Sequence, residues 1–188
     1  MVNVHKALKN SYADKATRRK KIGGYHLDES LSNHNQQVYF HPKKKEMLYT
    51  IAGTHNLSDV GTDVALAFGG LKGTKRYKEA DNTFKKAKAK YGGAKATVMG
   101  HSLGGSIAGY ITDPKQDTVV TLDKGATFGQ RVRDEEKAYR TSGDYASLLS
   151  RRDKNMKTLS NKHKKQNIIK DALNAHLVDN IKDAGLNH

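Results

Sequence analysis

Residues Ala96-Thr97-Val98-Met99-Gly100-His101-Ser102-Leu103-Gly104-Gly105 form the most informative pattern in this 188-residue chain. They open as an apolar, partly β-branched run, which predicts a strand, and the small residues at 106–112 predict a helix after it. Between them lies a Gly-x-Ser-x-Gly pattern. A serine on so sharp a strand-to-helix turn has strained geometry, and flanking glycines let strand and helix approach closely. The alternative is an ordinary glycine-rich turn, but the two adjacent elements favour a nucleophilic serine.

Strand and helix patterns alternate along the rest of the chain. Strands are expected at residues 37–42, 47–53, 95–100 and 118–122, and helices at residues 59–70, 75–91, 106–112 and 160–186. Residues 25–35 are polar and are expected to form a loop, whereas residues 134–142 are ambiguous. Such alternation indicates parallel βαβ units and therefore an α/β fold. The length, without repeats or linkers, fits one domain.

The charge of the chain is strongly positive. Its 34 Lys and Arg against 19 Asp and Glu give a formal net charge of +15, concentrated in residues 1–22, 72–95 and 151–170. Such a field attracts nucleic acid, an anionic membrane surface or an acidic protein, although solvated Lys-rich helix faces would give the same composition. Residues 1–22 have seven basic and few apolar side chains. We therefore expect 1–22 to be a basic accessory arm beside a single folded domain at 23–188.

Composition excludes several classes of protein. The chain has no cysteine, which excludes a disulfide framework and a thiolate metal site. It has no run approaching the roughly 18–20 apolar residues of a membrane span, and its N-terminus lacks the apolar region of a secretory signal. The histidines are scattered, and the glycine-rich stretch at 68–76 lacks the spacing of a phosphate loop. No metal, no cofactor and no secretion are expected.

Three motifs together resemble one known family. The segment 100–105 following a strand is similar to the nucleophile elbow of the class 3 (fungal-type) lipases of the α/β-hydrolase superfamily. Ile51-Ala52-Gly53-Thr54, followed by Asp59 and Asp63, resembles a second motif of that family, and residues 126–132 resemble a third. The motifs occur in the family's order, and the resemblance covers about residues 36–180. The chain also resembles the short lipase-like proteins of large DNA viruses.

The resemblance implies a compact α/β-hydrolase-like fold with a mostly parallel sheet flanked by helices. It also implies a serine esterase or lipase that cleaves carboxylic esters through an acyl-enzyme. Ala52 and Val60 stand where the family usually has Arg and Trp, and the third motif lacks its proline. The chain is short, which leaves little or no room for a lid. These departures concern substrate and interfacial activation more than the fold.

A catalytic triad in the order Ser, acid, His is what the resemblance implies. Ser102 would be the nucleophile, which needs a histidine to take its proton. Three histidines follow the third motif. His176 lies beside apolar residues and is favoured over His163, which has basic neighbours, and over His188, the terminal residue.

The acid of the triad is less well defined. Asp144 is similar to the family's acid and is favoured over Asp153, which lies beside two arginines, and over Asp123. The oxyanion hole would use the backbone N–H of Leu103, the residue after the nucleophile, and by resemblance that of Thr54.

Two other functions stay open. The first is a weakly active or inactive lipase-fold protein with a structural or interaction role, such as a virion component, that binds acidic partners or nucleic acid through its basic surface. The second is an enzyme that acts on phospholipid at an anionic membrane surface. An intracellular or virion-associated location is expected in each case.

Overall fold

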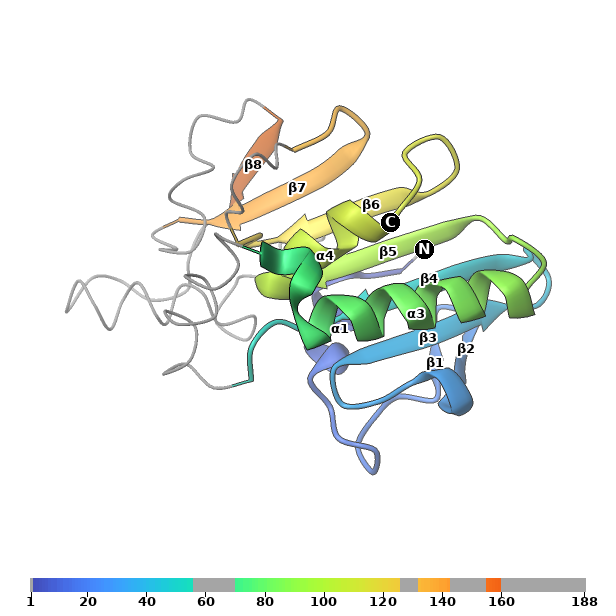
Figure 1. Cartoon of the computed structure of the whole chain (residues 1–188). Coiled ribbons are helices and arrows are strands. Elements are labelled where there is room, and N and C mark those ends of the chain that lie inside the picture. The colour runs from blue at the N-terminus through green and yellow to red at the C-terminus, as the bar shows by residue number, and fades with distance from the viewer. Residues whose placement is uncertain (1, 56–69, 126–131, 143–154, 160–188) are drawn as a thin grey trace.

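The strands form one eight-stranded sheet whose spatial order, β1 to β8, is also the order in the sequence (Figure 1). The computed structural model describes residues 2–55, 70–125, 132–142 and 155–159. The strands are β1 (Lys21–Ile22), β2 (Tyr25–Asp28), β3 (Gln36–His41), β4 (Glu46–Ile51), β5 (Ala96–His101), β6 (Thr118–Leu122), β7 (Glu136–Thr141) and β8 (Met156–Leu159). The helices are α1 (Val4–Ser11), α3 (Lys75–Lys90) and α4 (Leu103–Ile111), with 3₁₀ turns η1 (Glu29–Leu31) and η2 (Leu71–Gly73).

The mode of strand pairing changes once across this sheet, at β4. Strands β1 to β4 pair antiparallel through short connections, and the β3–β4 turn holds Lys45 at φ 55°. Strands β4 to β8 pair parallel, and α3 and α4 form the crossovers that the parallel pairs β4–β5 and β5–β6 require. The predicted α/β fold with a mostly parallel sheet is confirmed. The helices expected at 59–70 and 160–186 lie outside the described residues.

Helices α3 and α4 cover the same face of the sheet (Figure 1). Successive right-handed crossovers that advance in one direction place their helices on one side. The core of this face combines apolar side chains of β4, β5 and β6 with Ala80, Phe84 and Ala87 of α3 and Ile107 of α4. The predicted amphipathic helix at 75–91 is therefore confirmed.

The opposite face of the sheet is covered by α1. Val4, Ala7 and Leu8 are buried against Leu48 of β4 and Met99 of β5. The prediction that residues 1–22 have little to bury is therefore wrong. The prediction considered how few apolar residues the segment has but not how they are spaced. Positions 4, 7 and 8 form one continuous helix face, which can be buried.

Polar contacts also fix the N-terminal segment to the sheet. The Asn10 side chain donates to the Gln37 side chain at 2.8 Å and to Tyr39 Oη at 2.7 Å, while Tyr39 donates to the carbonyl of Arg19 at 3.0 Å. These groups are buried or half-buried, where an unmade hydrogen bond is costly. Residues 2–22 thus belong to the folded domain.

Two other segments differ from expectation. Residues 25–28 form β2 rather than a loop, because their backbone pairs with residues 38–40 of β3, which are distant in sequence. Residues 136–141 form β7, whose buried Glu136 is neutralised by Lys124 at 3.0 Å. Pairing across the sheet, which local periodicity does not record, decides both segments.

A buried carboxylate, that of Asp28, joins strand β2 to helix α3. Burial alone would raise the pKa of Asp28, but hydrogen bonds from Lys90, Ser30 and Tyr91 lower it to about 2. The charged form of Asp28 therefore ties the β2 end to the C-terminal end of α3.

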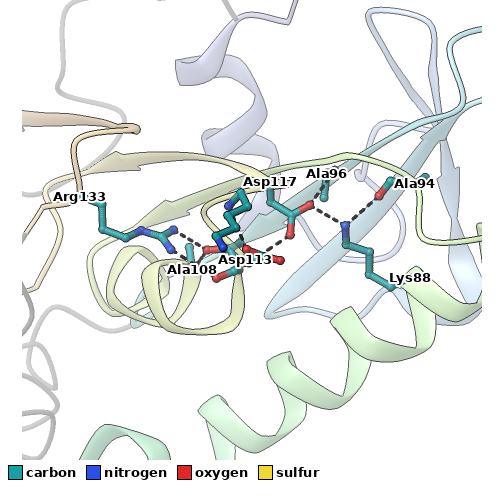
Figure 2. A network of polar contacts seen from close by, with 9 residues as sticks. Lys88, Ala94, Ala96, Ala108, Asp113, Asp117 and Arg133 are labelled. Atoms are coloured by element: carbon teal, nitrogen blue, oxygen red, sulfur yellow. Dashed lines mark hydrogen bonds and ion pairs between the residues drawn. The ribbon is translucent and has the colours of Figure 1, made fainter.

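A second carboxylate network lies at the start of the parallel strands (Figure 2). Asp117 accepts from Lys88 Nζ at 2.6 Å and from the Ala96 N–H at 3.1 Å, while Lys88 also donates to the Ala94 carbonyl at 2.9 Å. These bonds fix the N-terminal ends of β5 and β6 relative to α3. The carboxyl ends of the same strands, where chemistry is expected, lie at the opposite edge.

Candidate active site

Ser102 lies at the carboxyl end of β5, one residue before α4. Its φ of 53° and ψ of −125° confirm the strained turn expected at this position. The Ser102 N–H donates to the Leu122 carbonyl at 3.0 Å, and its carbonyl accepts from the N–H groups of Gly105 at 2.9 Å and Gly125 at 3.2 Å. Several backbone bonds from β6 and α4 thus hold the residue in a conformation that an isolated chain disfavours.

The glycines on either side of Ser102 make this turn sterically possible. A β-carbon on Gly100 would lie 2.3 Å from the Gly104 carbonyl oxygen, and one on Gly104 would lie 2.3 Å from the Ile51 carbonyl oxygen. Both distances are far below van der Waals contact, and both neighbours are backbone. The prediction that glycine is required on each side of the serine is confirmed.

The segment after β4 lies directly against the serine. A β-carbon on Gly53 would lie 2.8 Å from Ser102 Cβ and 2.7 Å from Tyr12 Oη. Thr54 follows in the chain, and Leu103 is the first residue of α4. The structure thus brings Ser102, Leu103 and the segment that carries Thr54 to one sheet edge, while the roles of Leu103 and Thr54 as oxyanion donors stay predictions.

Arg76 is a residue of this region that the sequence did not reveal. From the first turn of α3, its Nη2 donates to the Ala52 carbonyl at 2.7 Å and its Nη1 to the Gly53 carbonyl at 3.4 Å. The sequence has alanine at position 52, where the similar family has arginine. A guanidinium nevertheless contacts this segment, because Arg76 of α3 reaches Ala52 from 24 residues further along the chain. Nothing local to Arg76 signals this contact.

Tyr12 is the second residue that sequence reasoning missed. Its hydroxyl oxygen accepts from the Gly53 N–H at 2.7 Å and lies 2.5 Å from His101 Nδ1. Burial raises the pKa of Tyr12 well above its usual value, so the phenol is neutral. The sequence feature that could have revealed Tyr12 is the apolar face of α1, because packing of that face places the residue after the helix against the sheet edge.

The two histidines next to these motifs have different surroundings. His101 is buried, and its ring meets that of Tyr12 edge-on with centroids 5.7 Å apart. His55 is exposed, with its ring 5.3 Å from that of Tyr12 and 5.8 Å from that of His34. Although much of its side chain is exposed, partial desolvation of the ring and the positive charge of Arg76 lower the pKa of His55. His55 is therefore mainly neutral near pH 7.

Asp123 is the one candidate acid within the described residues. It follows β6, is fully buried, and has φ of 47°. Its Oδ1 accepts from the Thr141 N–H at 2.5 Å and its Oδ2 from the Thr141 hydroxyl at 2.8 Å. The adjacent Lys124 forms a buried ion pair with Glu136. Asp123 therefore fixes the end of β7 to the end of β6, which favours a structural role.

The remaining predicted site residues lie outside the described residues. They are Asp59, Asp63, Asp144, Asp153, His163, His176 and His188. Of the third motif, the structure describes Val132 alone. Across the part of the chain that is described, no group of three or more His, Asp or Glu could hold a metal ion, and no helix is long and apolar enough to cross a membrane.

Comparison with known proteins gives structural matches but no sequence match. No protein-family model matches the chain, and no curated protein sequence matches it. The structure is similar to that of Lip2 lipase from Yarrowia lipolytica, with a TM-score of 0.56, 17% identity, and coverage of 85% of this chain and 77% of the lipase. Lipase II from Rhizopus niveus matches with a TM-score of 0.49 and 15% identity over 77% of this chain and 73% of that one. The first similarity shows that the chain has a lipase-like α/β-hydrolase fold.

Proposed function

We propose that the chain is a serine hydrolase that cleaves carboxylic esters through an acyl-enzyme on Ser102. The observation that supports this most strongly is the backbone of Ser102, with φ of 53° and ψ of −125° between Gly100 and Gly104. A strained residue persists only where its surroundings impose the conformation, and such strain concentrates at functional sites. A serine in an ordinary turn would not require such a strained backbone.

The chemistry follows from the partners predicted for this serine. Ser102 Oγ attacks the ester carbonyl carbon while His176 takes its proton, and Asp144 holds the imidazole in the required tautomer. The N–H groups of Leu103 and Thr54 stabilise the negative carbonyl oxygen of the tetrahedral intermediate. Collapse of that intermediate expels the alcohol, which receives the proton from His176. Water then attacks the acyl-enzyme by the same route and regenerates the serine.

Lipids are the proposed substrate class. The described fold is similar to that of a solved fungal lipase, which supports an ester or lipid substrate more than a peptide or a phosphate ester. The net charge of +15 favours anionic surfaces on which such esters are presented. Both statements are proposals, because a shared fold does not fix a substrate.

Asparagine at the triad acid tests this proposal. In Asp144→Asn the amide can stabilise the wrong histidine tautomer, so hydrolysis of a short-chain p-nitrophenyl ester is expected to fall by up to about 10⁴-fold with the fold intact. Asp153→Asn is the matched control and is expected to keep wild-type turnover. Loss of turnover in Asp153→Asn alone would transfer the acid role to Asp153. A wild-type protein that hydrolyses no such ester would contradict the proposed function.

A further inference from the structure

The hydroxyl of Tyr12 joins three segments at the candidate site. Tyr12 caps the C-terminus of α1, Gly53 follows β4, and His101 ends β5 beside Ser102. The phenol oxygen accepts from the Gly53 N–H at 2.7 Å and lies 2.5 Å from His101 Nδ1.

Gly53 is therefore fixed from two sides. Its N–H is held by Tyr12, and the carbonyls of Ala52 and Gly53 are held by Arg76. No side chain fits at Gly53, since a β-carbon there would lie 2.8 Å from Ser102 Cβ and 2.9 Å from the His101 carbonyl oxygen. Tyr12 and Arg76 together hold the Ala52–Gly53 peptide, and Arg76 also contacts the Gly53 carbonyl, which shares its peptide group with the Thr54 N–H. Restraining both peptides limits the directions that the Thr54 N–H can take.

We propose that Tyr12 is a positioning residue of the hydrolase, which orients the Gly53–Thr54 peptide toward the oxyanion that forms on the Ser102 adduct. This inference rests on the function proposed above. Tyr12 touches no reacting atom and acts through Gly53. The N-terminal segment, expected from its sequence to be an accessory arm, thereby completes the catalytic edge of the sheet.

The size of the effect follows from the geometry that an oxyanion hole requires. A donor stabilises the developing charge only when it lies about 2.7–3.1 Å from it, and removing one donor lowers turnover by about 10²–10³-fold. A displacement of about 1 Å costs as much as about 10²-fold. Loss of the Tyr12 hydroxyl loosens the donor without removing it. We therefore expect a fall of about 10- to 100-fold.

Tyr39 provides a matched control for structural effects. Its buried hydroxyl also holds the N-terminal segment, through Asn10 at 2.7 Å and the Arg19 carbonyl at 3.0 Å. It lies in β3 and makes no described bond to Gly53, Thr54 or His101. Tyr39→Phe thus weakens the attachment of the same segment without removing a bond at the site.

The experiment compares wild type, Tyr12→Phe and Tyr39→Phe in hydrolysis of a p-nitrophenyl ester, below the unfolding temperature of each. Phenylalanine keeps the ring contacts of Tyr12 with His101 and His55. Tyr12→Phe is expected to lower kcat about 10- to 100-fold with KM within about threefold, because the bond acts in the transition state. Tyr39→Phe is expected to keep kcat within about threefold. The proposal would be overturned if Tyr12→Phe kept the wild-type kcat, or if Tyr12→Phe and Tyr39→Phe lost kcat to the same extent.

Amide hydrogen exchange of Gly53 gives a measurement that needs no enzyme activity. Wild-type Gly53 is expected to exchange at least about tenfold more slowly than in Tyr12→Phe, with Tyr39→Phe close to wild type. If wild type hydrolyses no ester, the proposed function fails, and this exchange ratio still decides whether Tyr12 orders the segment. A rapidly exchanging Gly53 amide in wild type would overturn the positioning role even if Tyr12→Phe does not fold.

Discussion

Ser102→Ala is expected to lower ester turnover by about 10⁵–10⁶-fold, to the residual rate that binding and oxyanion donors supply without a nucleophile. The substitution removes one oxygen atom and keeps the β-carbon, so packing against Gly53 is retained. Initial rates with a short-chain p-nitrophenyl ester, extended to hours for the variant, measure the effect. A loss of less than about tenfold would mean that hydrolysis occurs elsewhere on the protein.

Ser102→Gly separates strain from chemistry at the same position. Glycine adopts positive φ without a steric penalty, whereas alanine keeps the strain of serine at φ 53°. The glycine variant is expected to be equally inactive but more stable than Ser102→Ala by about 1 kcal/mol in urea unfolding. Equal stability of the two variants would show that the turn at Ser102 is not strained.

Gly104→Ala is expected to destabilise the protein by about 4 kcal/mol or more, or to prevent folding. The new β-carbon would lie 2.3 Å from the Ile51 carbonyl oxygen and 2.7 Å from that of Ala52. These are backbone atoms at the end of β4, which pairs with β3 and β5, so relief would require α4 to move away from the sheet. Thermal unfolding followed by circular dichroism measures the loss, which corresponds to roughly 8–16 °C.

Gly73→Ala is the control for this substitution. No atom lies within 4 Å of a β-carbon at Gly73, and its φ is not in the left-handed region. Its unfolding temperature is expected to stay within about 2 °C of wild type. A Gly104→Ala protein as stable as Gly73→Ala would contradict the close approach of α4 to β4 that defines the turn.

Features encoded within a few residues were predictable from the sequence. The turn at Ser102 was predictable because the serine, its glycines and the adjacent strand and helix are contiguous. The strands at 47–51 and 118–122 were predictable because both are apolar runs buried on both faces of a parallel sheet region.

Features that depend on distant partners were not predictable. Strand β2 exists through pairing with β3, and the buried Glu136 of β7 is tolerated because Lys124 lies beside it. Tyr12 reaches Gly53 from 41 residues away in the sequence, and Arg76 reaches Ala52 from 24 residues away. Such contacts form only when the sheet brings the segments together, so no local pattern records them. The choice of Asp144 over Asp153 as the triad acid, and of His176 over His163 and His188 as its base, stays a prediction.

Reaction with a fluorophosphonate distinguishes an activated serine from an ordinary one, because only a serine whose proton is accepted by a base attacks phosphorus at an appreciable rate. The folded wild-type protein is treated with the reagent, digested and analysed by mass spectrometry, with Ser102→Ala and urea-unfolded wild type as controls. We expect one phosphonyl group per chain, on the peptide that contains Ser102, and none in either control. An unlabelled wild-type protein, or equal labelling of Ser102→Ala, would contradict the assignment of Ser102 as a catalytic nucleophile.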